Sequence, residues 1–220
     1  WDLENFSASM KTADVLVTWD FPTNNLSKVA PRLKMIHIIG AGVEHLCPMD
    51  WVPKEVTVVN NRGVHALKGG QFGLMSVLML NSKIPLILNN QQRFHWESIY
   101  SSPVDGKILL VIGVGNIGGA AGKQCARLGM KVIGISRHGH PVSGFSQVFT
   151  SDHLEKVLPN ADFVLMATPL TPETKNMLDR KKQSLMKFGV GVVNVGRSRT
   201  MDYDALVDNL NEGNFSGAII

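Results

Sequence analysis

Three glycines, Gly113, Gly115 and Gly118, stand in the order G-x-G-x-x-G between an apolar run and a helical pattern. The run over 107–112 is typical of a buried strand, and residues 116–128 have the periodicity of a helix. In such a unit the first glycine permits a tight turn, the second lets the backbone approach a pyrophosphate, and the third allows close contact between helix and strand. The segment therefore predicts a dinucleotide site; the alternative is a glycine-rich packing turn without a ligand.

Strands and helices are expected to alternate along the chain from about residue 13. Strands are predicted over 13–19, 34–41, 56–60, 107–112, 131–136, 162–168, 190–195 and 215–220, and 146–149 is compatible with a short extra strand. Helices are predicted over 25–30, 65–80, 116–128, 151–158, 179–187 and 202–210, with Pro85 ending or kinking whatever helix continues beyond it. This alternation predicts an α/β fold, in which a doubly wound parallel sheet forms a Rossmann-type domain.

The end of the second strand of this domain bears on which dinucleotide is preferred. An NAD site usually places a carboxylate there for the ribose hydroxyls, whereas this chain has Ser136 and Arg137. A guanidinium pairs with a 2′-phosphate that a carboxylate would repel. NADP(H) is therefore favoured and NAD(H) stays the alternative, as does a solvent-exposed loop arginine. His138 and His140 lack a third ligand, so no metal site is predicted.

Composition limits the remaining classes of protein. The chain has 220 residues, of which 44% are hydrophobic and 18% charged, and a net charge of +4. Because the basic run 180–182 has no interleaved aromatic residues, a solvated helix face is favoured over nucleic-acid binding. Cys47 and Cys125 lie far apart, which favours a reducing, cytoplasmic location, and Cys125 is expected to be a small buried residue. The apolar stretch 72–88 contains polar residues, so no membrane span is predicted.

A second candidate site follows the strand 190–195. Arg197, Ser198 and Arg199 come directly after it, and Asp202 is expected to cap the next helix. Open α/β sheets bind ligands at the carboxyl ends of their strands. Arg197 is therefore a candidate to bind an anionic ligand.

Several of these segments together resemble a known family. They are GKILLVIGVGNIG, ADFVLMATPLTPETKNML, GVGVVNVGRSRTMDYDALVDNLNEGNFSGA and IIGAGVEHL. In this order they resemble the D-isomer-specific 2-hydroxyacid dehydrogenases, including the glyoxylate/hydroxypyruvate reductases, over nearly the whole chain. The resemblance implies part of a smaller flavodoxin-like substrate domain over 1–61 and a dinucleotide-binding domain over 62–220.

The resemblance also implies roles for individual residues. Arg197 matches the catalytic arginine that orients the keto acid and polarises its carbonyl, with Ser198 in place of the usual glycine. The backbone of Gly42 and Val43 matches the loop that holds the substrate carboxylate. Further positions matching the coenzyme site are Asn116, Ile117, Thr168, Pro169, Asn194 and Val195. Trp19 is interpreted as a core residue in preference to a pocket wall.

The activity implied is hydride transfer between NADP(H), or less favourably NAD(H), and a small 2-keto or D-2-hydroxy acid such as glyoxylate or hydroxypyruvate. A non-catalytic dinucleotide-binding sensor or protein-interaction module of the corepressor type is the alternative. By the resemblance, the family's catalytic histidine and its glutamate lie beyond the last residue, and its first strand and helix are missing from the front. The chain is therefore expected to be cut at both ends and inactive as given. The helix from His65 is expected to contribute to a homodimer interface.

Overall fold

The computed structural model describes residues 4–220 and divides the chain into two compact units. The first unit ends at Val64 and the second is His65–Ile220. Each unit has a parallel sheet and a hydrophobic core of its own. The two units are described separately below.

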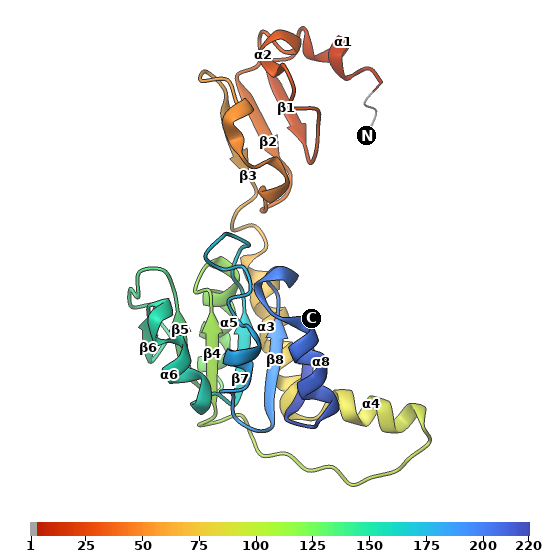
Figure 1. The fold of residues 1–220 in the computed structure, drawn as a ribbon, viewed down its shortest axis with the longest axis vertical. Helices are drawn as coiled ribbons and strands as arrows, with labels where there is room; N and C mark the ends of the chain where they lie inside the picture. Colours follow the sequence, from red (N-terminus) through yellow and green to blue (C-terminus); the bar gives the residue numbers. More distant parts are fainter. Residues whose placement is uncertain (1–3) are drawn as a thin grey trace. The chain divides into compact units, whose positions relative to one another are not determined.

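The first unit is built on a three-stranded parallel sheet in the order β1-β2-β3 (Figure 1). Its elements are α1 (Phe6–Met10), β1 (Val15–Thr18), α2 (Leu26–Val29), β2 (Met35–Ile38), the short 3-10 helices η1 (Glu44–Leu46) and η2 (Met49–Trp51), and β3 (Thr57–Asn60). The central strand β2 carries Ile36 and Ile38, which are fully buried. These β-branched side chains form the centre of a small apolar core.

The second unit contains a six-stranded sheet in the order β6-β5-β4-β7-β8-β9, and every neighbouring pair of strands is parallel. The strands are β4 (Ile108–Ile112), β5 (Lys131–Ile135), β6 (Gln147–Phe149), β7 (Phe163–Met166), β8 (Val190–Asn194) and β9 (Phe215–Ile219). Counted within the unit, this is the order 3-2-1-4-5-6 of a dinucleotide-binding sheet, and it reverses between β4 and β7. The predicted doubly wound α/β fold is confirmed.

Helices cover both faces of this sheet. The helical segments are α3 (Ala66–Asn81), α4 (Ile84–Gln92), α5 (Asn116–Ala126), η3 (Ser151–His153), α6 (Leu154–Val157), η4 (Leu158–Asn160), α7 (Arg180–Gln183), η5 (Ser198–Thr200) and α8 (Tyr203–Asn211). Successive strand residues point to opposite faces. Leu109 and Val111 therefore belong to the core beneath α3 and α5, whereas Leu110 and Ile112 belong to the core beneath α6 and α8.

Helix α3 packs against α5 through small residues. A Cβ built on Gly70 would lie 2.7 Å from the Cβ of Ala120, and one on Gly73 would lie 2.8 Å from that of Ala121. These glycines therefore allow the two helices to approach closely. The opposite side of α3 leaves larger apolar side chains exposed, including Leu67, Phe72 and Met75.

Several helix boundaries differ from those expected. The helix expected over 179–187 is regular only over Arg180–Gln183, and the following chain turns back at Gly189, which has φ +77°. The helix expected over 151–158 is divided into η3, α6 and η4, with Pro159 in the first turn of η4. Pro85 lies in the first turn of α4, where its missing N–H is tolerated, so it starts a helix.

The length and apolar composition of α3 and α4 bear on whether a helix of this chain could span a membrane. Among residues 4–220 no single helix is long and apolar enough to cross a membrane. Taken together, α3 and α4 reach that length and composition, but a bend of 63° separates them.

Candidate functional site

Strand register places three loops in one row at the carboxyl edge of the second unit's sheet. Ile112 on β4 pairs with Met166 on β7, and Met166 pairs with Asn194 on β8. The residues that follow these strands are therefore neighbours. They include Gly113 and Thr168 from the first two loops, at the point where the strand order reverses.

Gly113 and Gly118 are required by close packing in the first of these loops. Gly113 has φ +99°, and a Cβ there would lie 2.7 Å from the carbonyl carbon of Ala167. A Cβ on Gly118 would overlap the carbonyl oxygen of Gly113. These two glycines hold the start of α5 against β4 and the end of β7.

Gly115 has a different environment. It is the N-cap of α5, with φ −95° and ψ −156°, and a Cβ there would have no atom within 4 Å. Space is thus open at the helix start, where N–H groups and the helix dipole favour an anion. Asn116 and Ile117 form the first turn; Asn116 is exposed, and Ile117 contacts the position of Gly69 on α3.

The side chain of Thr168, in the loop after β7, is a second indication that a ligand binds here. Its side-chain hydroxyl is buried and has no hydrogen-bond partner among the described residues. Buried polar groups are usually satisfied. An open helix N-terminus and an orphaned hydroxyl in the adjacent loop fit a bound dinucleotide. Pro169, the next residue, is exposed, and its carbonyl accepts a bond of 2.6 Å from the Thr174 hydroxyl.

The loop after β5 carries the groups expected to distinguish the two dinucleotides. The Ser136 hydroxyl accepts a 3.0 Å bond from the Gly139 N–H, and Arg137 is exposed. A bond from the Thr171 hydroxyl lowers the pKa of Glu173, and the charge of Arg137 contributes to this shift. A carboxylate therefore lies near Arg137, which the sequence pattern did not indicate.

The neighbouring histidines form no recognisable metal site. The rings of His138 and His140 lie 5.7 Å apart. Within the described chain no three His, Cys, Asp or Glu side chains group as metal ligands.

The loop after β8 fixes the backbone of Arg197. Its carbonyl accepts bonds from the Thr200 hydroxyl at 2.6 Å and from the Thr200 N–H at 3.1 Å. The Asn194 side chain accepts a 2.9 Å bond from the Gly196 N–H and donates to the Tyr203 hydroxyl at 3.0 Å. The Arg197 side chain lies at the exposed surface, while Thr200 is fully buried. Asn194 and Thr200 thus position the loop that carries Arg197.

This loop also touches the end of β7. A Cβ on Gly196 would lie 2.7 Å from the carbonyl oxygen of Thr168. Val195 is half-buried and packs on the core beneath α3 and α5. The sequence analysis did not identify Thr200 and Tyr203, although both lie within two residues of the predicted helix cap Asp202. The Asp202 side chain does accept a hydrogen bond from the Ala205 N–H, at 2.9 Å.

In the first unit, a turn after β2 presents two backbone N–H groups. The carbonyls of Gly40 and Ala41 accept bonds from the Asn61 N–H at 3.1 Å and from the Asn60 side chain at 2.8 Å. The N–H groups of Gly42 and Val43 donate to no backbone carbonyl within residues 4–220. The turn is therefore anchored from β3 while both N–H groups stay available to an anion.

Trp19, beside this turn, is not the core residue that we expected. It is 42% exposed, and its ring stacks on His45 with centroids 4.7 Å apart. A Cβ on Gly40 would overlap this ring. The strand β1 ends at Thr18, so Trp19 belongs to the loop and is held at the surface by Gly40 and His45.

The parallel sheet order and the glycine turn at its reversal define a dinucleotide-binding α/β protein. The family model for the D-isomer specific 2-hydroxyacid dehydrogenase, NAD binding domain, matches residues 74–220. The chain belongs to this family of NAD(P)-dependent 2-hydroxyacid dehydrogenases, which confirms the resemblance inferred from the sequence.

Known relatives agree with this assignment. The chain is 28% identical over 222 residues to a D-3-phosphoglycerate dehydrogenase of Methanocaldococcus jannaschii, covering 99% of this chain and 42% of the relative. It is similar to a D-isomer specific 2-hydroxyacid dehydrogenase from Xanthobacter autotrophicus Py2 in complex with NADPH and MES, with 26% identity, a TM-score of 0.84 and coverage of 95% and 66%. It is also similar to an Aquifex aeolicus D-lactate dehydrogenase complexed with NAD and lactic acid, with 25% identity, a TM-score of 0.78 and coverage of 96% and 65%.

The chain thus spans about two fifths of the length of the curated relatives that it matches. Both NADPH and NAD occur in the similar structures.

Proposed function

We propose that this chain is part of an oxidoreductase that transfers a hydride between NADP(H) and a small 2-keto or D-2-hydroxy acid, such as glyoxylate or hydroxypyruvate. The observation that carries the proposal is the position of Arg197 on a loop fixed by Asn194 and Thr200. Gly196 of this loop packs against Thr168, and Thr168 lies in the loop next to the glycine turn. The reduced coenzyme supplies the hydride. A sensor without catalysis has no need of a carboxylate-binding arginine at this position.

Arg197 would act as a fixed positive charge and a planar donor. A guanidinium binds a carboxylate through two parallel hydrogen bonds and stays charged at neutral pH. The same group stabilises the negative charge that develops on a ketone oxygen as a hydride arrives. In the first unit, the N–H groups of Gly42 and Val43, which donate to no backbone carbonyl among the described residues, are suited to an anion such as a carboxylate.

The natural full-length protein should oxidise NADPH when glyoxylate or hydroxypyruvate is added, as followed by loss of absorbance of the reduced coenzyme. Product analysis should give the D isomer wherever the product is chiral. Tight coenzyme binding without turnover on any small 2-keto acid would instead support the sensor function.

Removing Arg137 should abolish most of the proposed preference for NADP(H). A charge-assisted bond to the 2′-phosphate contributes roughly 1.5–3 kcal/mol, about ten- to a hundredfold in affinity. Arg137→Ala should therefore weaken NADPH binding by that factor and leave NADH binding nearly unchanged, as measured by calorimetry.

Arg127→Ala is the matched control, because Arg127 is an exposed arginine at the opposite end of α5. It should bind both coenzymes like the unaltered protein. Equal or tighter binding of NADH by the unaltered protein would contradict the preference.

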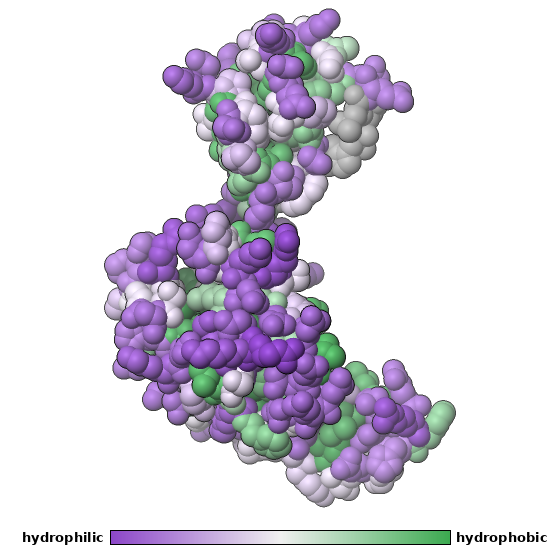
Figure 2. All heavy atoms as spheres, in the orientation of Figure 1, coloured by the Kyte–Doolittle hydropathy of each residue, from purple (hydrophilic) through white to green (hydrophobic). Residues whose placement is uncertain are grey.

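We further propose that a second copy of the chain covers the outer face of α3. Leu67 is 70% exposed, Phe72 42% and Met75 45% on this helix, and Figure 2 shows further hydrophobic residues at the surface along the neighbouring α4. Light scattering at tens of micromolar should give a dimer, and Phe72→Asp should shift it to monomer. Val207→Asp, a charge placed on exposed α8, should leave the dimer intact; a monomer before substitution would refute the interface.

A further inference from the structure

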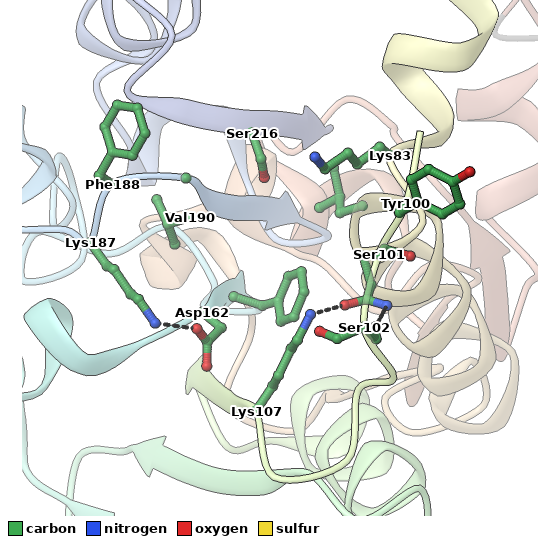
Figure 3. A pocket seen from close by; sticks show the side chains of 14 residues that line it. Lys83, Tyr100, Ser101, Ser102, Lys107, Asp162, Lys187, Phe188, Val190 and Ser216 are labelled. Carbon is green, nitrogen blue, oxygen red and sulfur yellow. Dashed lines mark hydrogen bonds and ion pairs between the residues drawn. The ribbon is translucent and has the colours of Figure 1, made fainter. Parts of the chain in front are cut away.

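The second unit has a cavity at the edge of the sheet opposite the glycine turn (Figure 3). Its volume is about 290 Å³. Lys107, Asp162 and Lys187 line it and come before β4, β7 and β8, whereas the glycine turn, Thr168 and Arg197 come after these strands. The cavity is therefore separate from the proposed coenzyme site by the length of the strands.

The charged lining of this cavity is mainly basic. It comprises Lys83, Lys107, Lys187 and one carboxylate, Asp162. Three positive charges and one negative charge leave a net charge of +2. Figure 3 shows the ammonium ends of Lys83 and Lys107 directed into the space between the α3–α4 corner and the strand ends.

Two of these lysines are held in place by neutral or acidic partners. The Lys107 ammonium lies 2.5 Å from the Asn81 side-chain oxygen, and the Lys187 ammonium lies 2.5 Å from one oxygen of Asp162. An ammonium has three donors, so each lysine keeps donors for a ligand. Side chains held in this way lose little freedom on binding, which favours affinity.

Asp162 is already fully engaged. Its second oxygen accepts a 2.8 Å bond from the Ile108 N–H. Partial burial opposes ionisation of Asp162, but the bonds from Ile108 and Lys187 outweigh it and lower its pKa. Both of its oxygens are therefore directed at the protein: Asp162 holds Lys187 by an ion pair, and its charge also acts on Lys107.

Neutral donors complete the lining. Tyr100, Ser101 and Ser216 line the cavity, and their hydroxyls make no hydrogen bond within the described part of the chain. Figure 3 shows the Ser216 hydroxyl directed into the cavity. Hydroxyls and ammonium groups together are the donors that bind phosphate oxygens. We propose that this cavity binds a small dianion of the phosphate monoester class, with a net charge that matches the +2 of the lining.

The size of the cavity limits the ligand. Sites for drug-sized ligands occupy about 300–1,000 Å³, so about 290 Å³ is small on this scale. A phosphate group with a few carbon atoms fits this volume, and a whole dinucleotide does not. The ligand is therefore a small metabolite and not a second coenzyme.

The test is a titration of the ¹⁵N-labelled 220-residue chain with inorganic phosphate and then with glycerol 3-phosphate, followed by amide NMR shifts. Chloride is used to match the ionic strength, and saturating NADPH occupies the glycine turn. Saturable shifts are expected at residues 81–83, 100–107 and 187–190, and not at 113–119. Glycerol 3-phosphate should bind at least as tightly as phosphate.

Two variants connect the shifts to the lysines. Lys83 has φ +54°, a conformation that Asn tolerates, so Lys83→Asn removes a charge without backbone strain. Lys83→Asn combined with Lys187→Gln should weaken binding about tenfold, and Lys83→Asn alone, which breaks no ion pair, about threefold. Lys131→Gln combined with Lys156→Gln removes two exposed lysines outside the cavity and should leave the affinity unchanged.

The proposal is overturned if no saturable shifts occur at the cavity, if the only shifts lie at 113–119, or if the double variant binds with the original affinity. Thermal melts of all variants without ligand show whether they are folded. If the double variant is unstable, the Lys83→Asn result decides.

Discussion

Arg197→Ala in the natural full-length protein should lower kcat/KM for small 2-keto acids by at least about a hundredfold, which is about 2.7 kcal/mol of transition-state stabilisation. In the proposed mechanism the substitution removes both the planar group that donates to the carboxylate of the substrate and the positive charge beside the developing oxyanion. The loop should keep its main anchor, because the bonds from Thr200 are accepted by the Arg197 carbonyl; the Arg197 side chain itself donates to the Gly196 carbonyl at 3.5 Å. Steady-state kinetics should show the loss, with coenzyme affinity and melting temperature near those of the unaltered protein.

Arg199→Ala is the control for this experiment. Arg199 is also exposed and lies in the same loop, where its carbonyl accepts a 2.8 Å bond from the Asn176 N–H. Its side chain has no proposed role, so kcat/KM should change by less than about threefold. Normal activity without Arg197, or an equal loss without Arg199, would remove Arg197 from its assigned role.

The sequence predicted the parts of the fold that depend on local pattern. β-branched runs gave the strands, and the glycine turn predicted a helix that starts at Asn116 directly after β4. Long elements such as α3 and α5 were placed to within a few residues, because their apolar periodicity extends over several turns. Short helices such as α7 were overestimated, because a single turn is stabilised mainly by its surroundings. α7 ends at Gln183, and turns follow it up to Gly189, which has φ +77°.

Contacts between distant segments were not predictable from the pattern. The glycines on one face of α3 are explained only by the folded structure, in which Gly70 and Gly73 pack against Ala120 and Ala121 on α5. The same holds for Glu173, which the folded chain brings near Arg137 from a loop after another strand. Such contacts depend on strand order and register, which short-range periodicity does not specify.

In the candidate site, too, some features follow from a local motif and others only from contacts between distant segments. A motif sufficed to suggest Gly113 and Gly118, but the packing reason for each became visible only with the end of β7 beside them. Trp19 was misjudged because large aromatic residues are usually mostly buried, whereas here Gly40 and His45 support its ring at the surface. Thr200 was overlooked because its hydroxyl bonds to the carbonyl three residues earlier, a local motif that forms only once the turn after β8 has its conformation.

Gly115→Ala should weaken coenzyme binding by at least about a hundredfold, about 2.7 kcal/mol, without destabilising the fold. The backbone at Gly115, with φ −95° and ψ −156°, is open to alanine, and the added methyl would meet no protein atom within 4 Å. The methyl instead enters the space where a pyrophosphate approaches the start of α5. Calorimetry with NADPH and NADH should show the loss for both coenzymes, because both carry the same pyrophosphate.

Substitutions at two neighbouring glycines distinguish a loss of coenzyme binding from a loss of packing. Gly119→Ala lies one turn further into α5, where the N–H already donates to the Gly115 carbonyl at 2.8 Å, and its Cβ would meet no atom within 4 Å. It should bind coenzyme within about threefold of the unaltered protein and melt no lower, because alanine favours a helix over glycine by about 1 kcal/mol. Gly118→Ala should instead lower the melting temperature, since its Cβ overlaps the Gly113 carbonyl oxygen. If Gly115→Ala binds both coenzymes normally, the open space at the start of α5 is not where the pyrophosphate lies, and the glycine turn serves packing alone.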